Sequence, residues 1–238
     1  ELAVVASRLR LGQEEWEPAA PFWDAPDRND HGNALWWDGR DTIFHFNGLG
    51  TDGTWGKLAL VLRTSTDNGA TWSKALLINP QHGLRHLVIA GVFQTRSDHI
   101  VLSCDAVTGG TGGTALHISR DAGQTWVDPG ENAAKPSFAD GKTGAWIAGI
   151  HAGVTEMRDG RLMALGRGDS INGQMPRSIS SERGSSTRRW IVRRSGRAPA
   201  LGSKPVSTMN VFARSVSFTF RFCCSSRFMD MPIKMSTI

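Results

Sequence analysis

The sequence predicts an all-β propeller made of four-stranded antiparallel units, and three observations support this fold class. The pattern Ser-x-Asp-x-Gly-x-Thr-Trp occupies residues 65–72 and recurs 54 residues later, at 119–126. Residues 100–105 alternate with the period of two that is expected of a strand. A repeat of about 55 residues made of such strands is typical of propeller blades. Dipeptides typical of hairpin turns separate apolar alternating runs, at Asp38-Gly39, Ser97-Asp98 and Asp159-Gly160.

Each eight-residue motif predicts a tight turn between the third and fourth strands of a unit. The Asp carboxylate is expected to accept hydrogen bonds from the turn, the Gly to adopt a positive φ, and the Trp to bury its ring beneath the hairpin. The motif residues therefore have an expected structural role. They are Asp67, Gly69, Trp72, Asp121, Gly123 and Trp126.

The remaining elements follow from the repeat. Residues 3–10 resemble a strand of an incomplete first unit, and Trp16 stands where an earlier motif would place its Trp. Residues 180–184 occupy the position of a third motif, with Glu182 in place of Asp. The scarcity of helical periodicity and the 27 glycines argue against helices. Strands are expected at 87–95, 100–107, 115–120, 125–127, 153–157, 162–168 and 176–180.

The composition changes near residue 184. Residues 1–182 contain 16 Lys and Arg against 21 Asp and Glu, whereas 183–238 contain 11 basic residues and one acidic residue, Asp230. The third motif also stops before its Thr-Trp pair. We therefore predict a propeller fragment over 1–184. We expect a basic tail over 185–238 that is frame-shifted, the shift falling near 184–187, or disordered.

This charge distribution weakens the case for several function classes. The chain has a pI of about 9.6, but its basic residues are concentrated in the tail. The pairs Arg188-Arg189 and Arg193-Arg194 could bind phosphates nonspecifically, yet the tail lacks the interleaved aromatic residues of a stacking platform. No specific nucleic-acid partner, membrane span or metal-ligand spacing is expected.

Blade topology sorts the polar residues into two ends. Because the motif turns join strands three and four at one end, the loops between units and the ends of second strands emerge at the other, which we call the mouth. We expect a ligand site there, although a hydrogen-bonded loop residue is the alternative at each position. The candidates are Arg28, Asp30, His31, Arg85, His86, His151 and Arg167.

These motifs resemble the Asp-boxes of the sialidase (neuraminidase) superfamily, the BNR-repeat propellers, in a divergent bacterial subgroup. The resemblance implies a six-bladed propeller, of which 1–184 would supply about three to three and a half blades. Residues 149–167 resemble a sialidase stretch in which an Arg that binds the substrate carboxylate follows a catalytic-pair Glu. By that match Arg167 is the carboxylate-binding residue, with a guanidinium that we expect to be buried, and His151 stands at the Glu position. Glu156 is expected to be structural.

The resemblance favours a glycoside hydrolase of exo-α-sialidase type that acts on an acidic sugar or glycoconjugate without a cofactor, and suggests a secreted or periplasmic location. The family also uses a Tyr nucleophile, and this chain contains no Tyr. The chain as written is thus expected to be an inactive fragment. A non-catalytic propeller that binds carbohydrate or protein at the same mouth is the alternative.

Overall fold

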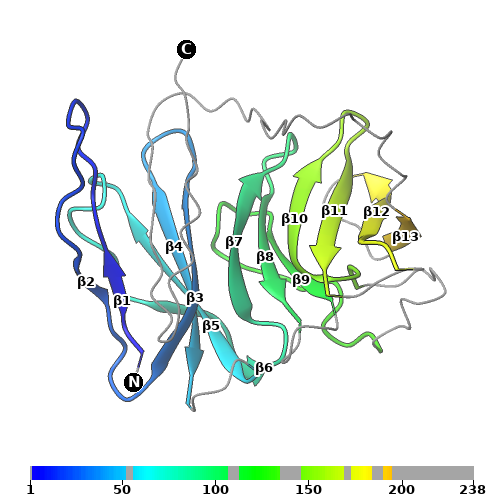
Figure 1. Cartoon of the computed structure of the whole chain (residues 1–238), viewed down its shortest axis with the longest axis horizontal. Coiled ribbons are helices and arrows are strands. Elements are labelled where there is room, and N and C mark those ends of the chain that lie inside the picture. Colours follow the sequence, from blue (N-terminus) through cyan, green and yellow to red (C-terminus); the bar gives the residue numbers. More distant parts are fainter. Residues whose placement is uncertain are drawn as a thin grey trace.

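The computed structural model describes residues 2–51, 56–106, 113–134, 146–168, 173–183 and 190–194. This part of the chain consists of β-strands and connecting turns, with no helix in the described ranges. The strands form sheets that stand side by side, as the blades of a propeller do (Figure 1). The predicted all-β fold class is confirmed.

Four antiparallel sheets follow one another along the chain. The first sheet pairs β1 (Val4–Ala6) with β2 (Ala20–Trp23). The second contains β3 (Asn29–Trp37), β4 (Ile43–Gly50), β5 (Leu58–Ser65) and β6 (Leu76–Gly83). The third contains β7 (Leu87–Gln94), β8 (Ile100–Asp105) and β9 (Thr114–Ser119), with a bridge from Ile118 to Val127 at its edge. The fourth contains β10 (Ile150–Glu156), β11 (Arg161–Arg167), β12 (Pro176–Arg183) and β13 (Trp190–Arg194).

The hydrophobic core lies between neighbouring sheets because each strand presents alternate side chains to opposite faces. Leu102 of β8 packs with Phe46 and other residues of the second sheet. Its neighbour in sequence, Val101, packs with Leu162 of the fourth sheet. All four side chains are completely buried, and burying each one contributes about 1.5–3 kcal/mol to stability. The third sheet is therefore buried on both faces.

Both eight-residue motifs form the same turn. The Asp67 carboxylate accepts hydrogen bonds from the backbone N–H of Thr71 at 2.8 Å and from the Ser65 hydroxyl at 2.8 Å. Asp121 accepts the corresponding bonds in the second motif. The hydroxyl groups of Thr71 and Thr125 also donate to these carboxylates, and this bond, followed by the others, lowers the pKa of each Asp to about 2. The remaining motif residues complete the turns: Gly69 and Gly123 have φ of +80° and +92°, Trp72 packs on Phe22, and Trp126 packs on Phe46.

The fourth sheet continues past residue 184, the predicted end of the propeller. β12 pairs with β13 from Ser180–Trp190 to Pro176–Arg194. Residues 180–183, predicted to begin a motif turn, lie instead in β12. The sequence lacks there the Asp whose carboxylate closes the other two turns. The rest of the predicted tail, 195–238, lies outside the described residues.

Candidate functional site

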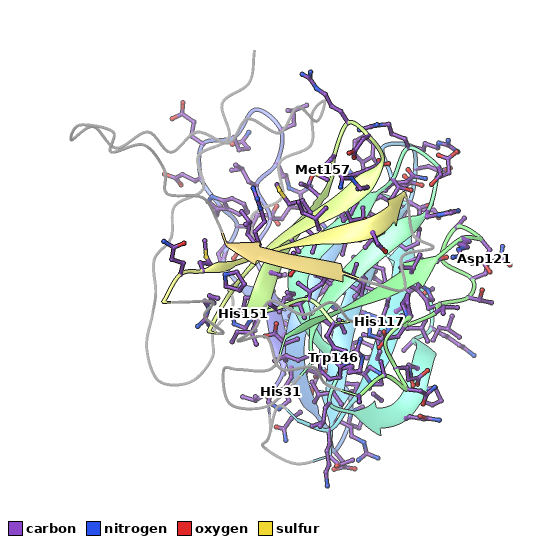
Figure 2. The ribbon with its side chains drawn as sticks, turned by 90° about the vertical axis from the view of Figure 1, so that its right-hand side faces the viewer. His31, His117, Asp121, Trp146, His151 and Met157 are labelled. Carbon is purple, nitrogen blue, oxygen red and sulfur yellow. The ribbon has the colours of Figure 1, made fainter. Side chains whose placement is uncertain are left out.

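The mouth is the end of the sheets at which inner strands begin and second strands end. β10 starts there at Ile150, and β8 and β11 finish there at Asp105 and Arg167. The motif turns follow β5 and β9 at the opposite end. Figure 2 shows His31 and His151 away from Asp121 and from Met157, which begins the β10–β11 turn.

The candidate site is built on a bulge at the start of β10. The pairing register with β11 shifts between Ile150 and Gly153, and His151 has a φ of +50°, which is unusual for a residue with a side chain. Thr114 of the third sheet holds this bulge: its hydroxyl donates to the Gly149 carbonyl at 2.9 Å and accepts from the Ala152 N–H at 3.3 Å. Strained conformations of this kind persist where the surrounding structure enforces them, and they are concentrated at functional sites.

Asp105 contacts His151 at two points. One carboxylate oxygen accepts the backbone N–H of His151 at 2.6 Å, and the other contacts ring nitrogen Nδ1. The Asp105 side chain is 2% exposed, whereas that of His151 is 45% exposed. Burial raises the pKa of Asp105, and the contacts with His151 and the charge of Arg167 oppose this shift. A buried carboxylate thus holds an imidazole whose other face meets solvent.

Arg167 ends β11 directly across from Ile150. Its side chain is exposed rather than buried, which differs from the buried guanidinium expected of it. The preceding residue, Gly166, faces the sheet interior, so strand alternation turns Arg167 outward. Within the described ranges, Arg167 makes no hydrogen bond or ion pair through its guanidinium. The structure therefore brings His151 and Arg167 to neighbouring strand ends.

Arg85 and His86 lie at the mouth but are buried, and both have protein partners. Arg85 forms an ion pair with Asp128 through two nitrogens, the second at 2.8 Å, and its guanidinium stacks 4.3 Å from the Trp146 ring centre. His86 bonds to the Leu58 carbonyl through Nδ1 at 2.7 Å. Asp128 neutralises the Arg85 charge within the chain, and the Leu58 carbonyl occupies one ring nitrogen of His86. These contacts indicate a structural role for Arg85 and His86.

Of the other three candidates, Asp30 and His31 lie at the start of β3 and Arg28 directly precedes it. Asp30 and His31 are buried, while Arg28 is exposed and donates to the Asp27 carbonyl at 2.7 Å. In the described residues, neither Asp30 nor Arg28 is linked to His151 by a hydrogen bond or ion pair. Glu156, at the opposite end, accepts the Arg96 N–H at 2.9 Å, which joins the third and fourth sheets as a structural contact.

Comparison with known proteins identifies the family. The model of the BNR repeat-like domain matches residues 1–198. The chain belongs to the BNR repeat-like domain family. A search of curated proteins finds no match.

Three solved structures show the same fold as this BNR repeat-like domain. The NanB sialidase of Streptococcus pneumoniae has a TM-score of 0.56 at 11% identity, over 81% of this chain and 46% of that one. A Dyadobacter fermentans protein of unknown function has a TM-score of 0.55 at 17% identity, over 82% and 58%. A Trypanosoma rangeli sialidase mutant displaying trans-sialidase activity has a TM-score of 0.50 at 16% identity, over 75% and 30%. The chain thus spans about half the length of the first two, and its predicted membership of the sialidase-like BNR superfamily is confirmed.

Sequence reasoning missed two residues that hold the BNR repeat-like domain's site together, Asp105 and Thr114. Asp105 stands at the end of a predicted second strand, so the rule that placed Arg167 at the mouth could have found it. Thr114 gives no such signal, because its hydrogen bonds to the bulge depend on a contact between two sheets. Among all the described residues, those of the site included, no group of three or more His, Cys, Asp or Glu side chains could hold a metal ion. The same residues contain no helix that is long and apolar enough to cross a membrane.

We expect Asp30→Asn to make the domain more stable at neutral pH. Burial raises the Asp30 pKa to about 6, with Asp24 adding to the shift and Arg63 opposing it. A raised acid pKa gives stability that is present below the unfolded value of 3.8 and is lost as pH rises through about 6. Asn stays neutral and keeps an acceptor for the Ala25 N–H, which Asp30 binds at 3.2 Å.

Urea unfolding at several pH values measures this effect. Asp30→Asn should gain about 1–2 kcal/mol over the parent above pH 7 and lose that advantage towards pH 4. Asp30→Ala serves as the control, because it removes the acceptor as well as the charge. An Asn variant that is less stable than the parent by the same amount at every pH would contradict the expectation.

Proposed function

We propose that this BNR repeat-like domain binds sugars that carry a carboxylate, of the sialic acid type, at the β10–β11 end of the mouth. The observation that carries the proposal is the exposed Arg167 guanidinium, which forms no hydrogen bond or ion pair with a described carboxylate and ends β11 across from the start of β10, where Asp105 holds the strained His151. A guanidinium pairs bidentately with a carboxylate, and such charge-assisted hydrogen bonds are among the stronger ones. The likeness to two sialidases supports an acidic sugar as the ligand.

We further propose that the domain is related in function to the exo-α-sialidase type of glycoside hydrolase. Sialidases use a Tyr nucleophile, and the 238 residues contain no Tyr. Recognition of the sugar is therefore the part of the function that these residues support. A non-catalytic carbohydrate-binding or protein-binding propeller would use the same mouth, and the Dyadobacter fermentans neighbour of unknown function is compatible with that alternative.

Replacement of Arg167 by alanine tests the proposal. We expect the affinity for N-acetylneuraminic acid, measured by calorimetry, to weaken by about 1.5–3 kcal/mol, the scale of a hydrogen bond to a charged group. Arg161→Ala is the matched control, because Arg161 begins the same strand at the opposite end and pairs there with Asp159. Equal affinities of the parent and the Arg167→Ala variant would refute the proposed role.

A further inference from the structure

His151 and Asp105 form a pair that carbohydrate binding through Arg167 does not by itself require. Both oxygens of Asp105 are engaged, one by the backbone N–H of His151 and one by its ring. The carboxylate comes from the third sheet and the imidazole from the fourth, so the pair also fixes the contact between sheets. A hydrogen bond of this kind determines which ring nitrogen of a neutral histidine carries the proton.

We infer that Asp105 is a positioning residue that holds the His151 proton on Nδ1, so that Nε2 faces the mouth as a hydrogen-bond and proton acceptor. This inference rests on the proposed function for its ligand: the carboxylate of an acidic sugar binds Arg167, and a hydroxyl of the same sugar donates to Nε2. The ligand class is therefore a hydroxylated carboxylic acid, held by one cationic and one neutral group.

The geometry favours this arrangement in three ways. An ionised carboxylate only accepts hydrogen bonds, so the Nδ1 that faces Asp105 must be the donor. The neutral ring then has its lone pair on Nε2. The half-exposed ring leaves room for a ligand, while the bulge held by Thr114 fixes the backbone that carries it. Cross-strand neighbours have Cβ atoms about 5 Å apart, so a residue next to Ile150 lies within the span of one sugar from Arg167.

The tautomer is measured first, without any ligand. Long-range ¹H–¹⁵N spectra of the full chain, recorded at increasing pH until the ring signals no longer change, distinguish a protonated ring nitrogen from an unprotonated one. We expect a protonated Nδ1 and an unprotonated Nε2 for His151, assigned by the signals that disappear in His151→Gln. A His151 ring protonated on Nε2 would overturn the inference.

Asp105→Asn tests the cause of this tautomer. The Asn side chain has one acceptor and one donor end. If its oxygen keeps the His151 backbone N–H, its NH₂ faces Nδ1 and the ring proton must move to Nε2. A proton that stays on Nδ1 in a folded Asp105→Asn variant would contradict the role of Asp105. Should this variant not fold, the tautomer of the parent protein still decides the inference.

The last step adds N-acetylneuraminic acid and follows the Nε2 signal. We expect the signal to move as the nitrogen accepts a hydrogen bond in the parent, and to move much less at equal ligand concentration in Arg167→Ala. Binding that leaves Nε2 unchanged would overturn the inference while the proposed function stands. An absence of binding at any concentration would refute the proposed function and the ligand part of the inference, and the tautomer result would still decide the role of Asp105.

Discussion

Replacing Gly32 by alanine is expected to destabilise the protein by about 3–5 kcal/mol, because overpacking adds to a positive φ. Gly32 lies in the β3 bulge between His31 and Asn33 and has a φ of +59°. A Cβ at this position would lie 2.2 Å from the Val88 carbonyl oxygen, which belongs to the backbone of the neighbouring inner strand β7. Backbone atoms cannot rotate away as a flexible side chain does. The second and third sheets would therefore have to move apart, and urea unfolding would measure the loss.

Two other glycines provide matched controls. Gly12 and Gly39 also have positive φ, +82° and +80°, but a Cβ at either position would meet no atom within 4 Å. Alanine there should lower the free energy of unfolding by about 1 kcal/mol, through backbone strain alone. A Gly32→Ala variant as stable as Gly39→Ala would show that the two inner strands do not approach as closely as the structure has them.

The Arg85→Met substitution is expected to lower the free energy of unfolding by about 3–5 kcal/mol, because it leaves the Asp128 carboxylate buried without its cation. The side chains of Arg85 and Asp128 are 8% and 2% exposed. Burial by itself raises the pKa of Asp128, but its hydrogen bonds to Arg85 and the nearby charges hold the value below the ordinary one. Methionine preserves most of the side-chain volume over Trp146, so the expected loss is mainly electrostatic.

Two comparisons separate this effect from a general sensitivity to substitution. Arg161→Met removes the exposed partner of Asp159 and should lower stability by less than about 1 kcal/mol. The double variant Arg85→Met with Asp128→Leu should recover much of the loss, since no buried charge remains uncompensated. If Arg85→Met were as stable as the parent, the ion pair with Asp128 would not contribute to stability, and Arg85 would again be a candidate for ligand binding.

Local patterns were sufficient to predict most of the fold. The alternation of residues 100–105 predicted β8, and it also explains why Leu102 faces the second sheet while Val101 faces the fourth. The two motifs predicted the turns after β5 and β9, since their hydrogen bonds lie within a few residues. β13 was missed because its pairing with β12 has no signal in the basic composition of the chain around it.

The candidate site was predicted only in part, because local patterns do not reveal contacts between segments that are far apart in the sequence. Strand order placed His151 and Arg167 at one end of the fourth sheet. The partners of mouth residues depend instead on contacts between distant segments: Asp128 is 43 residues from Arg85, and Asp105 is 46 from His151. No local sequence pattern connects residues this far apart. Arg85 was therefore predicted to be a ligand residue, although the structure pairs it with a buried carboxylate.

A crystal structure of this domain with N-acetylneuraminic acid bound would test the central claim most directly. The account predicts that the sugar carboxylate lies within hydrogen-bond distance of the Arg167 guanidinium, about 2.7–2.9 Å, and that a sugar hydroxyl reaches Nε2 of His151. A sugar bound beside the Asp67 and Asp121 turns, or one bound at the mouth with its carboxylate turned away from Arg167, would contradict it.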